Sequence, residues 1–326
     1  MTSEALKAWE RQGRNSMAER ILVAGGAGFI GSHLCDYLIA RGYQVVCVDS
    51  LITGNKKNIS HLLKSGKFSF LKKDISKKIS VGGKISQIYN LASPASPVDY
   101  QQKPLQTLEA GSAGVKNLLD FARSKGAKFL FASTSEVYGN PLEHPQKETY
   151  WGNVNSFGPR SCYDEAKRFG EALCYSYREK YSLDVKIARI FNTYGPRMRK
   201  DDGRVVPNFI VQALAQKPIT IYGDGSQTRS FCYVSDMVDG LYKLMNSQET
   251  SPVNLGNPNE ITILGLARLI TSIAGGRYEL VYADLPADDP ERRLPDISLA
   301  KQKLGWQPEV GLGDGLRKTI DFFRTA

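Results

Sequence analysis

A glycine-rich loop constrains this chain more than any other stretch of its sequence. The apolar residues 21–24 come first, Gly25, Gly28 and Gly31 follow at regular intervals, and a helical pattern then runs to Gly42. Glycines in this arrangement allow a tight turn, close approach of the backbone to a pyrophosphate, and close packing of the helix on the strand. The order of strand, loop and helix therefore predicts a dinucleotide site at the helix N-terminus.

Asp49 comes at the end of the next predicted strand, which covers residues 44–48. A carboxylate at this place accepts hydrogen bonds from the adenosine ribose and repels a 2′-phosphate, so Asp49 predicts NAD rather than NADP. Capping of the following loop is the alternative role for this side chain. Asp74 and Ile75 follow the third predicted strand and are expected beside the adenine.

Strands and helices alternate up to residue 191, which indicates an α/β fold with a doubly wound parallel sheet of the Rossmann type. The remaining pattern predicts strands at 68–71, 87–91, 128–132 and 183–190, and helices at 105–125 and 161–181. The prolines within 92–97 are expected to stop a helix and to leave a rigid loop at the carboxyl edge of the sheet.

After Pro196 the elements become shorter and the loops richer in glycine and proline, which predicts a smaller C-terminal α/β lobe that binds the substrate. The predicted elements are helices within 203–216 and 236–245, strands at 219–222 and 229–234, a strand at 253–255 that returns to the main sheet, and two or three helices in the tail. The predicted domains are an extension at 1–19, interpreted as an amphipathic helix or a disordered lead, a cofactor-binding domain at 20–191 plus about 230–256, and the lobe at 192–229 and 257–326.

Composition narrows the classes of protein further. The 326 residues show no signal peptide and no apolar run close to the ~18 residues that cross a bilayer. Five scattered cysteines without a Cys-x-x-Cys pair predict a reducing, cytoplasmic location. With three histidines, a metal site is not expected. The net charge of +10 suits a nucleic acid, an anionic membrane surface or an anionic small substrate, and a solvated basic face is the simpler interpretation.

A second group of residues predicts proton-transfer chemistry. The stretch 133–139 (STSEVYG) leaves a buried strand at the carboxyl edge, where open α/β sheets bind ligands. Tyr163 and Lys167 lie four residues apart, and therefore on one face of the predicted helix. A lysine ammonium beside a phenol is expected to lower the pKa of the phenol. With Thr134, these side chains would oxidise an alcohol; a capping threonine and a core tyrosine are the structural alternative.

These motifs resemble the extended short-chain dehydrogenase/reductase superfamily. Within it, the chain is similar to the UDP-glucuronate decarboxylases, or UDP-xylose synthases, over residues 20–324. The similar stretches are 90–97 (NLASPASP), 133–139, 162–168 (CYDEAKR), 188–198 (ARIFNTYGPRM), 202–206 (DGRVV), 222–229 (YGDGSQTR) and 254–258 (NLGNP). The chain departs from that family's pattern at 108–111 (LEAG), Ser50 and Leu294, and the first departure bears on substrate identity.

The resemblance implies decarboxylation of UDP-glucuronate to UDP-xylose through a 4-keto intermediate, with NADH recycled internally. It implies NAD as cofactor and a homodimer formed by the helices within 105–125 and 161–181, without a metal, a membrane or a nucleic acid. The catalytic residues would be Thr134, Ser135, Glu136, Tyr163 and Lys167. NAD would contact the last two and Gly25, Gly28, Phe29, Ile30, Gly31, Asp49, Thr53, Gly54, Asp74, Ile75, Leu91, Ala92, Ser93 and Ser133. The substrate would contact Pro94, Asn192, Arg199, Val206, Asn208, Tyr222, Arg229 and Arg293, with Arg197 a further candidate.

Ser135 and Glu136 bear on the choice between related reactions. The similar 4,6-dehydratases usually place Asp-Glu here, because they need an acid for the C6 hydroxyl and a base for the C5 proton, and serine is a poor acid. A 4-epimerase needs neither group, so the Thr-Ser-Glu sequence favours decarboxylation. The alternatives are a UDP-glucuronate 4-epimerase, a dTDP-glucose 4,6-dehydratase, a non-catalytic RNA-binding relative, and a purely capping or ion-pairing Glu136. The pattern does not distinguish uracil from thymine.

Overall fold

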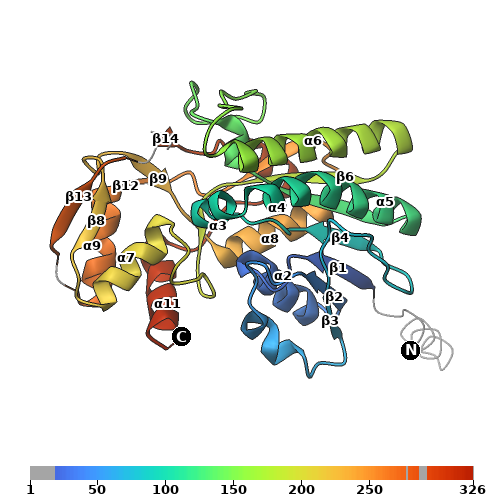
Figure 1. The fold of residues 1–326 in the computed structure, drawn as a ribbon, viewed down its shortest axis with the longest axis horizontal. Helices are drawn as coiled ribbons and strands as arrows, with labels where there is room; N and C mark the ends of the chain where they lie inside the picture. The colour runs from blue at the N-terminus through green and yellow to red at the C-terminus, as the bar shows by residue number, and fades with distance from the viewer. Residues whose placement is uncertain (1–18, 277, 286–291, 326) are drawn as a thin grey trace, which may run out of the picture.

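Seven parallel strands form a central sheet in the order β11-β6-β5-β4-β1-β2-β3 (Figure 1). The computed structural model describes residues 19–276, 278–285 and 292–325, so the extension predicted at 1–19 lies outside the described residues except for Glu19. The strands are β1 (Arg20–Ala24), β2 (Gln44–Asp49), β3 (Phe68–Lys72), β4 (Gln87–Asn90), β5 (Lys128–Thr134), β6 (Val185–Ile190) and β11 (Pro252–Leu255). Every strand predicted for the main sheet is present, including the one that returns to its edge.

Alternate residues of each strand face opposite sides of the sheet, and both sides are apolar. In β1, Ile21 and Val23 belong to one buried cluster, while Leu22 and Ala24 belong to the other. All four side chains are fully buried. Strands that are apolar on both faces are typical of a parallel sheet with helices on each side.

Helices cover both faces of this sheet. They are α2 (Phe29–Ala40), α4 (Pro104–Glu109), α5 (Val115–Lys125), α6 (Ser161–Tyr181) and α8 (Val234–Met245). α2 packs against α8 in the first cluster, and α6 packs against α4 and α5 on the other face, where Figure 1 shows α6 alongside α4 and α5, which follow each other end to end. The helix predicted at 161–181 has the bounds of α6. The one predicted at 105–125 is α4 and α5, joined by a π-helical turn, η2 (Ala110–Gly114).

The loop predicted at 92–97 is shorter than expected, because a helix begins inside it. α3 (Pro97–Gln102) starts at Pro97, and the Ser96 hydroxyl caps it by accepting the Asp99 backbone N–H at 3.3 Å. The prediction that the prolines stop a helix here was wrong. Proline has no N–H to lose at the first helical position, and its fixed φ already suits a helix.

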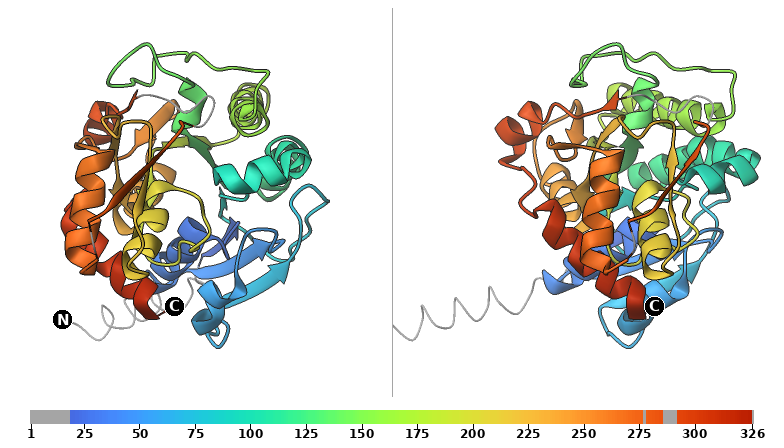
Figure 2. Two further views of the ribbon diagram at one scale, coloured as in Figure 1. Left: turned by 60° about the vertical axis from the view of Figure 1, so that its left-hand side comes forward. Right: turned by 90° about the vertical axis from the view of Figure 1, so that its left-hand side faces the viewer.

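The C-terminal half adds smaller sheets and helices to one side of the main sheet, on the left in Figure 1 and facing the viewer in the right panel of Figure 2. Its strands are β7 (Thr193–Tyr194), β8 (Ile219–Tyr222), β9 (Thr228–Ser230), β10 (Cys232–Tyr233), β12 (Glu260–Thr262), β13 (Leu280–Ala283) and β14 (Arg292–Arg293). Its helices are α7 (Val205–Leu214), α9 (Ile263–Ala274), α10 (Ser298–Leu304) and α11 (Leu312–Thr325). The strand predicted at 229–234 is two strands: β9 pairs with β12 and β14, whereas β10 pairs with β7.

None of the helices in the described part of the chain combines the length and the hydrophobicity that crossing a bilayer requires. Within those same residues, histidine, cysteine and carboxylate side chains form no group of three or more that could hold a metal ion. The division into a cofactor domain and a substrate lobe, with boundaries near residues 191, 230 and 256, stays a prediction.

Candidate active site

A cavity of about 660 Å³ opens where the carboxyl edge of the main sheet meets the C-terminal elements. The predicted site residues that line it are Gly25, Gly28, Phe29, Ile30, Gly31, Thr53, Leu91, Ser93, Ser133, Thr134, Ser135, Glu136, Tyr163, Lys167, Asn192, Arg197, Arg199, Val206, Asn208, Tyr222, Arg229 and Arg293. A smaller cavity of about 90 Å³ shares Gly25, Gly28, Thr53, Leu91 and Ser93 with it and adds the predicted residues Asp49, Gly54, Asp74, Ile75, Ala92 and Pro94. The structure therefore brings all of the predicted residues to two adjoining cavities.

The glycine-rich loop makes a tight turn that packs closely against neighbouring backbone at the start of α2. Gly25 has φ of +78°, and a Cβ there would lie 2.7 Å from the Ala92 nitrogen. A Cβ on Gly31 would lie 2.1 Å from the Gly25 carbonyl oxygen. The first turn of α2 contains no acidic residue, so its free N–H groups present only positive partial charge to the cavity. Such a helix start is suited to a pyrophosphate.

Asp49 is held in place by two backbone N–H groups. Ala27 donates to one carboxylate oxygen at 2.9 Å, and Leu51 donates to the other at 2.8 Å. Burial raises the pKa of Asp49, and the two hydrogen bonds oppose that shift. Each oxygen has accepted one hydrogen bond and can accept another, which leaves the carboxylate able to bind ribose hydroxyls.

Tyr163 and Lys167 are both buried in α6, close to the end of β5. The Lys167 ammonium donates to the Ala132 carbonyl at 2.8 Å and lies 5.6 Å from the centroid of the Tyr163 ring. α6 can approach β5 this closely because Gly170 faces the Phe131 ring, where a Cβ would come within 2.4 Å. The sequence prediction that these two side chains share one face is confirmed.

The predicted pKa shift of Tyr163 was wrong in direction. Burial raises the pKa of the phenol, and a hydrogen bond with Thr134 opposes this without reversing it. Burial also lowers the pKa of Lys167 to about 8. Desolvation is the largest cause of both shifts, because it disfavours the charged form of each group.

Glu136 lies in the 3₁₀ turn η3 (Ser135–Tyr138), directly after β5, and is ion-paired with two arginines. Arg293 contacts Oε1 at 3.1 Å and Oε2 at 3.2 Å, and Arg160 also binds Oε2. Burial opposes ionisation of Glu136, yet the charges of Arg293 and Arg160 outweigh it and hold the pKa below its usual range. Glu136 is therefore a carboxylate at neutral pH and can accept hydrogen bonds without donating a proton.

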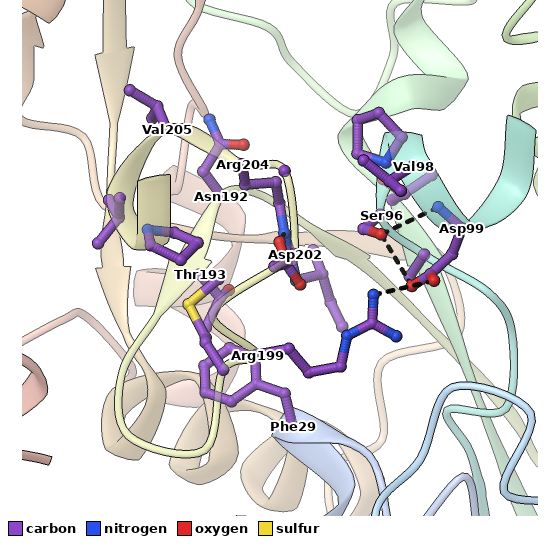
Figure 3. A pocket seen from close by; sticks show the side chains of 18 of the residues that line it. Phe29, Ser96, Val98, Asp99, Asn192, Thr193, Arg199, Asp202, Arg204 and Val205 are labelled. Carbon is purple, nitrogen blue, oxygen red and sulfur yellow. Dashed lines mark hydrogen bonds and ion pairs between the residues drawn. The ribbon is translucent and has the colours of Figure 1, made fainter. Parts of the chain in front are cut away.

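Arg199 is already engaged by carboxylates, so its predicted contact with an anionic substrate competes with them. Figure 3 shows it facing Asp99 across the cavity, at 2.9 Å, and it also contacts Asp201 at 3.2 Å. Arg204, which the sequence analysis did not select, lines the same cavity and forms an ion pair with the buried Asp202.

Sequence reasoning also missed Arg160, Tyr100 and Asp164. The Tyr100 ring stacks on Tyr163 with centroids 5.0 Å apart, and burial raises the pKa of Asp164 to about 7. Asp164 directly follows Tyr163 in the stretch 162–168, so its place next to the proposed reactive tyrosine is a local signal that could have drawn attention to it. Arg160 and Tyr100 follow no spacing rule, because their contacts depend on the tertiary fold.

Known proteins share this architecture and much of its sequence. The chain matches the family model described as GDP-mannose 4,6 dehydratase over residues 22–319. It is 51% identical to UDP-glucuronic acid decarboxylase 1 of Xenopus tropicalis over 306 residues, which cover 94% of this chain and 72% of that protein.

Solved structures of epimerases are also similar. UDP-glucose 4-epimerase of Thermotoga maritima, with UDP-glucose, has a TM-score of 0.87 and 31% identity, with 94% of this chain and 99% of that chain covered. UDP-glucuronic acid 4-epimerase of Bacillus cereus, in complex with UDP-glucuronic acid and NAD, has a TM-score of 0.83 and 29% identity. The match again covers 94% of this chain and 99% of that chain. Together with the glycine-rich loop, Asp49 and the Tyr163–Lys167 pair, these similarities show that the chain belongs to the UDP-glucuronic acid decarboxylase family of extended short-chain dehydrogenases/reductases.

Proposed function

We propose that this protein removes carbon dioxide from UDP-glucuronate to form UDP-xylose, with NAD as a retained cofactor. The observation that carries the proposal is an ionised Glu136 directly after Ser135, paired with Arg293 in the cavity that Tyr163 lines. The Xenopus tropicalis relative bears the name of this activity at 51% identity. Ser135 supplies no acid for the C6 hydroxyl, which disfavours a dehydratase.

The residues present fit NAD. The glycine-rich loop and the start of α2 suit its pyrophosphate, and Asp49 retains hydrogen-bonding capacity for the adenosine ribose. The similar Bacillus cereus epimerase is in complex with NAD. When bound, NAD would supply a hydride acceptor at sugar C4 and, later in the same turnover, a hydride donor. We therefore expect no requirement for a soluble reductant.

Tyr163 is the group that would take the proton of the C4 hydroxyl. Its hydrogen bond with Thr134 orients the phenol. Lys167, with a pKa of about 8, is mostly protonated at neutral pH and supplies the nearby positive charge. This positive charge favours the phenolate over the neutral phenol when the proton is transferred. Protonation of the same oxygen at the end of turnover would be the reverse of this step.

Glu136 and Arg293 would act after oxidation at C4. The C4 ketone is then β to the C6 carboxylate, so breaking the C5–C6 bond releases carbon dioxide and leaves the bond electrons in an enolate. A proton from water then adds to C5. Because Glu136 is ionised, we assign it the positioning of that water, while the Arg293 guanidinium faces the sugar acid.

The direct test is incubation of the purified protein with UDP-glucuronate and a small amount of NAD. We expect release of carbon dioxide and a product that proton NMR identifies as UDP-xylose, without consumption of NAD. A product of unchanged mass with inverted C4 would show a 4-epimerase instead. Loss of water, with retention of the carboxyl carbon, would show a dehydratase. Either result would overturn the proposal.

Asp49→Ala should weaken NAD binding and relax the preference over NADP. A hydrogen bond to a charged group contributes about 1.5–3 kcal/mol, so the affinity for NAD should fall roughly 10- to 100-fold. Titration of both cofactors into both proteins measures this. Asp36→Ala, which removes a carboxylate from α2 outside both cavities, is the matched control. Equal affinity of the unaltered protein for NAD and NADP would contradict the role given to Asp49.

We expect a homodimer in which α4, α5 and α6 pair with the same helices of a second copy. These helices leave apolar side chains exposed, with Leu105 70% and Phe169 50% accessible. A self-complementary patch is what a two-fold interface requires. Phe169→Glu should yield monomers in light scattering at micromolar concentration, whereas Tyr282→Glu, at an exposed tyrosine of β13, should not. A monomeric unaltered protein would contradict this.

We also expect a cytoplasmic location and no nucleic-acid partner. The five cysteines are free and buried, as expected for a reducing compartment. Part of the positive charge of the chain lies inside the cavity, because Arg160, Arg229 and Arg293 line it. These arginines suit the diphosphate and the carboxylate of a UDP-sugar acid.

A further inference from the structure

Arg293 reaches Glu136 from a different part of the chain, so their ion pair depends on how that segment is held. Arg293 is 2% exposed and belongs to β14, which pairs with β9. The residues after it, up to Asp296, lead to α10 and lie beside the loop that follows η3. Arg293 also donates to the Gly139 carbonyl at 3.1 Å. The position of its guanidinium thus follows from the position of this short backbone segment.

Gln146 holds that segment through main-chain and side-chain hydrogen bonds. Its N–H donates to the Leu294 carbonyl at 2.8 Å, and its side-chain oxygen accepts the Leu294 N–H at 2.8 Å. Its own carbonyl accepts the Asp296 N–H at 2.9 Å. Gln146 is fully buried, so these hydrogen bonds do not compete with water.

Asn254, at the edge of the main sheet in β11, joins this segment to the turn that carries Glu136. Its amide NH₂ donates to the Gln146 carbonyl at 3.0 Å and to the Asp296 carbonyl at 3.1 Å. Its amide oxygen accepts the Tyr138 hydroxyl at 2.8 Å, and Tyr138 belongs to η3 together with Glu136. Asn254 is fully buried. An amide suits this place because it combines two donors with an acceptor and carries no charge.

We propose that Asn254 and Gln146 are positioning residues, which fix Arg293 against Glu136 and thereby favour carbon dioxide loss and C5 protonation without taking part in C4 oxidation. This inference rests on the function proposed above. Neither residue lines the cavity, so neither can contact a ligand there. Their effect is geometric: a displacement of about 1 Å in a catalytic group can slow a reaction by about 10²-fold.

The test variant is Asn254→Asp, which keeps the shape and the acceptor for Tyr138 but loses both donors to the Gln146 and Asp296 carbonyls. In single turnover with NAD, the rate of carbon dioxide release divided by the rate of reduced-nicotinamide formation should fall about 10- to 100-fold. Backbone hydrogen exchange of the 292–297 peptide should also become faster, with or without substrate. A merely structural defect would lower both rates together and leave their ratio unchanged.

Gln87→Ala is the matched control, because Gln87 is a buried amide of the same sheet that does not line the cavity. It is the first residue of β4, and its side chain donates to Asn246. The Gln87→Ala variant should leave both the rate ratio and the 292–297 exchange unchanged. Gln146→Met, which removes the acceptor for Leu294, should reproduce the Asn254→Asp result and decides the matter if the first variant does not fold. In an Arg293→Lys background, Asn254→Asp should add little, since residues that act through one contact are not additive.

An unchanged ratio in both folded variants would overturn the inference, and so would a lowered ratio without faster exchange at 292–297. Failure of the proposed function looks different. In that case the unaltered protein releases no carbon dioxide from UDP-glucuronate, while hydrogen exchange still reports whether Asn254 and Gln146 hold the segment.

Discussion

Tyr163→Phe should abolish turnover of UDP-glucuronate, with a loss of about 10²- to 10⁴-fold, the range that a general acid–base group contributes. The variant keeps the ring that stacks on Tyr100 and removes only the hydroxyl that bonds Thr134. Because proton removal at the C4 hydroxyl comes first, reduced nicotinamide, carbon dioxide and UDP-xylose should all disappear together. Single-turnover absorbance and product NMR measure the three quantities in one experiment.

Tyr177→Phe is the matched control for this variant. Tyr177 lies in the same helix, α6, and its hydroxyl donates to Asp120 at 2.8 Å, away from the cavity. The Tyr177→Phe variant should therefore turn over UDP-glucuronate like the unaltered protein. If Tyr163→Phe still reduced NAD at a rate within about tenfold of the unaltered protein, Tyr163 would fall short of the contribution expected of a general base.

Glu136→Gln should separate the two halves of the reaction. Glutamine keeps the shape of the side chain but removes the charge that Arg293 and Arg160 compensate. Carbon dioxide release should slow by about 10²-fold or more, the lower end for an acid–base group, while reduced nicotinamide forms at a nearly normal rate. The reduced nicotinamide should therefore accumulate and persist in single turnover.

Glu165→Gln provides the comparison for this prediction. Glu165 lies on the half-exposed side of α6, 3.7 Å from Arg168, where ion pairs contribute little. It should leave the time course unchanged. Release of carbon dioxide by Glu136→Gln at the rate of the unaltered protein would make Glu136 a structural ion-pair residue, and the main argument for decarboxylation over epimerisation would be lost.

The elements that sequence reasoning found are those whose signals are local. The glycine-rich loop, Asp49 after β2 and the i, i+4 pair in α6 each lie within a few residues, and all appear where they were expected. The helix start at Pro97 was missed although its signal was local, because the role of proline at a first helical position was not weighed against its role as a breaker.

Other features could not be deduced because they depend on contacts between distant segments. Arg199 was expected to contact the substrate, and only the fold shows that Asp99 also faces it from α3. The pKa of Tyr163 depends on how deeply the fold buries the phenol, and no spacing in the sequence reports that depth. The partners of Glu136 come from residues 160 and 293, and only the fold shows that both reach the same carboxylate.

The return of β11 to the main sheet makes the two halves of this chain dependent on each other. β6 pairs with β11 along residues 187–190, and α8, which covers one face of the sheet, also comes from the later half. A fragment that ends after the predicted first domain, near residue 191, would expose the backbone edge of β6 and the apolar face under α8. Unpaired strand edges associate with other chains, so such a fragment should aggregate when expressed alone. Attempts to isolate the cofactor half would therefore have to keep the segment up to residue 256.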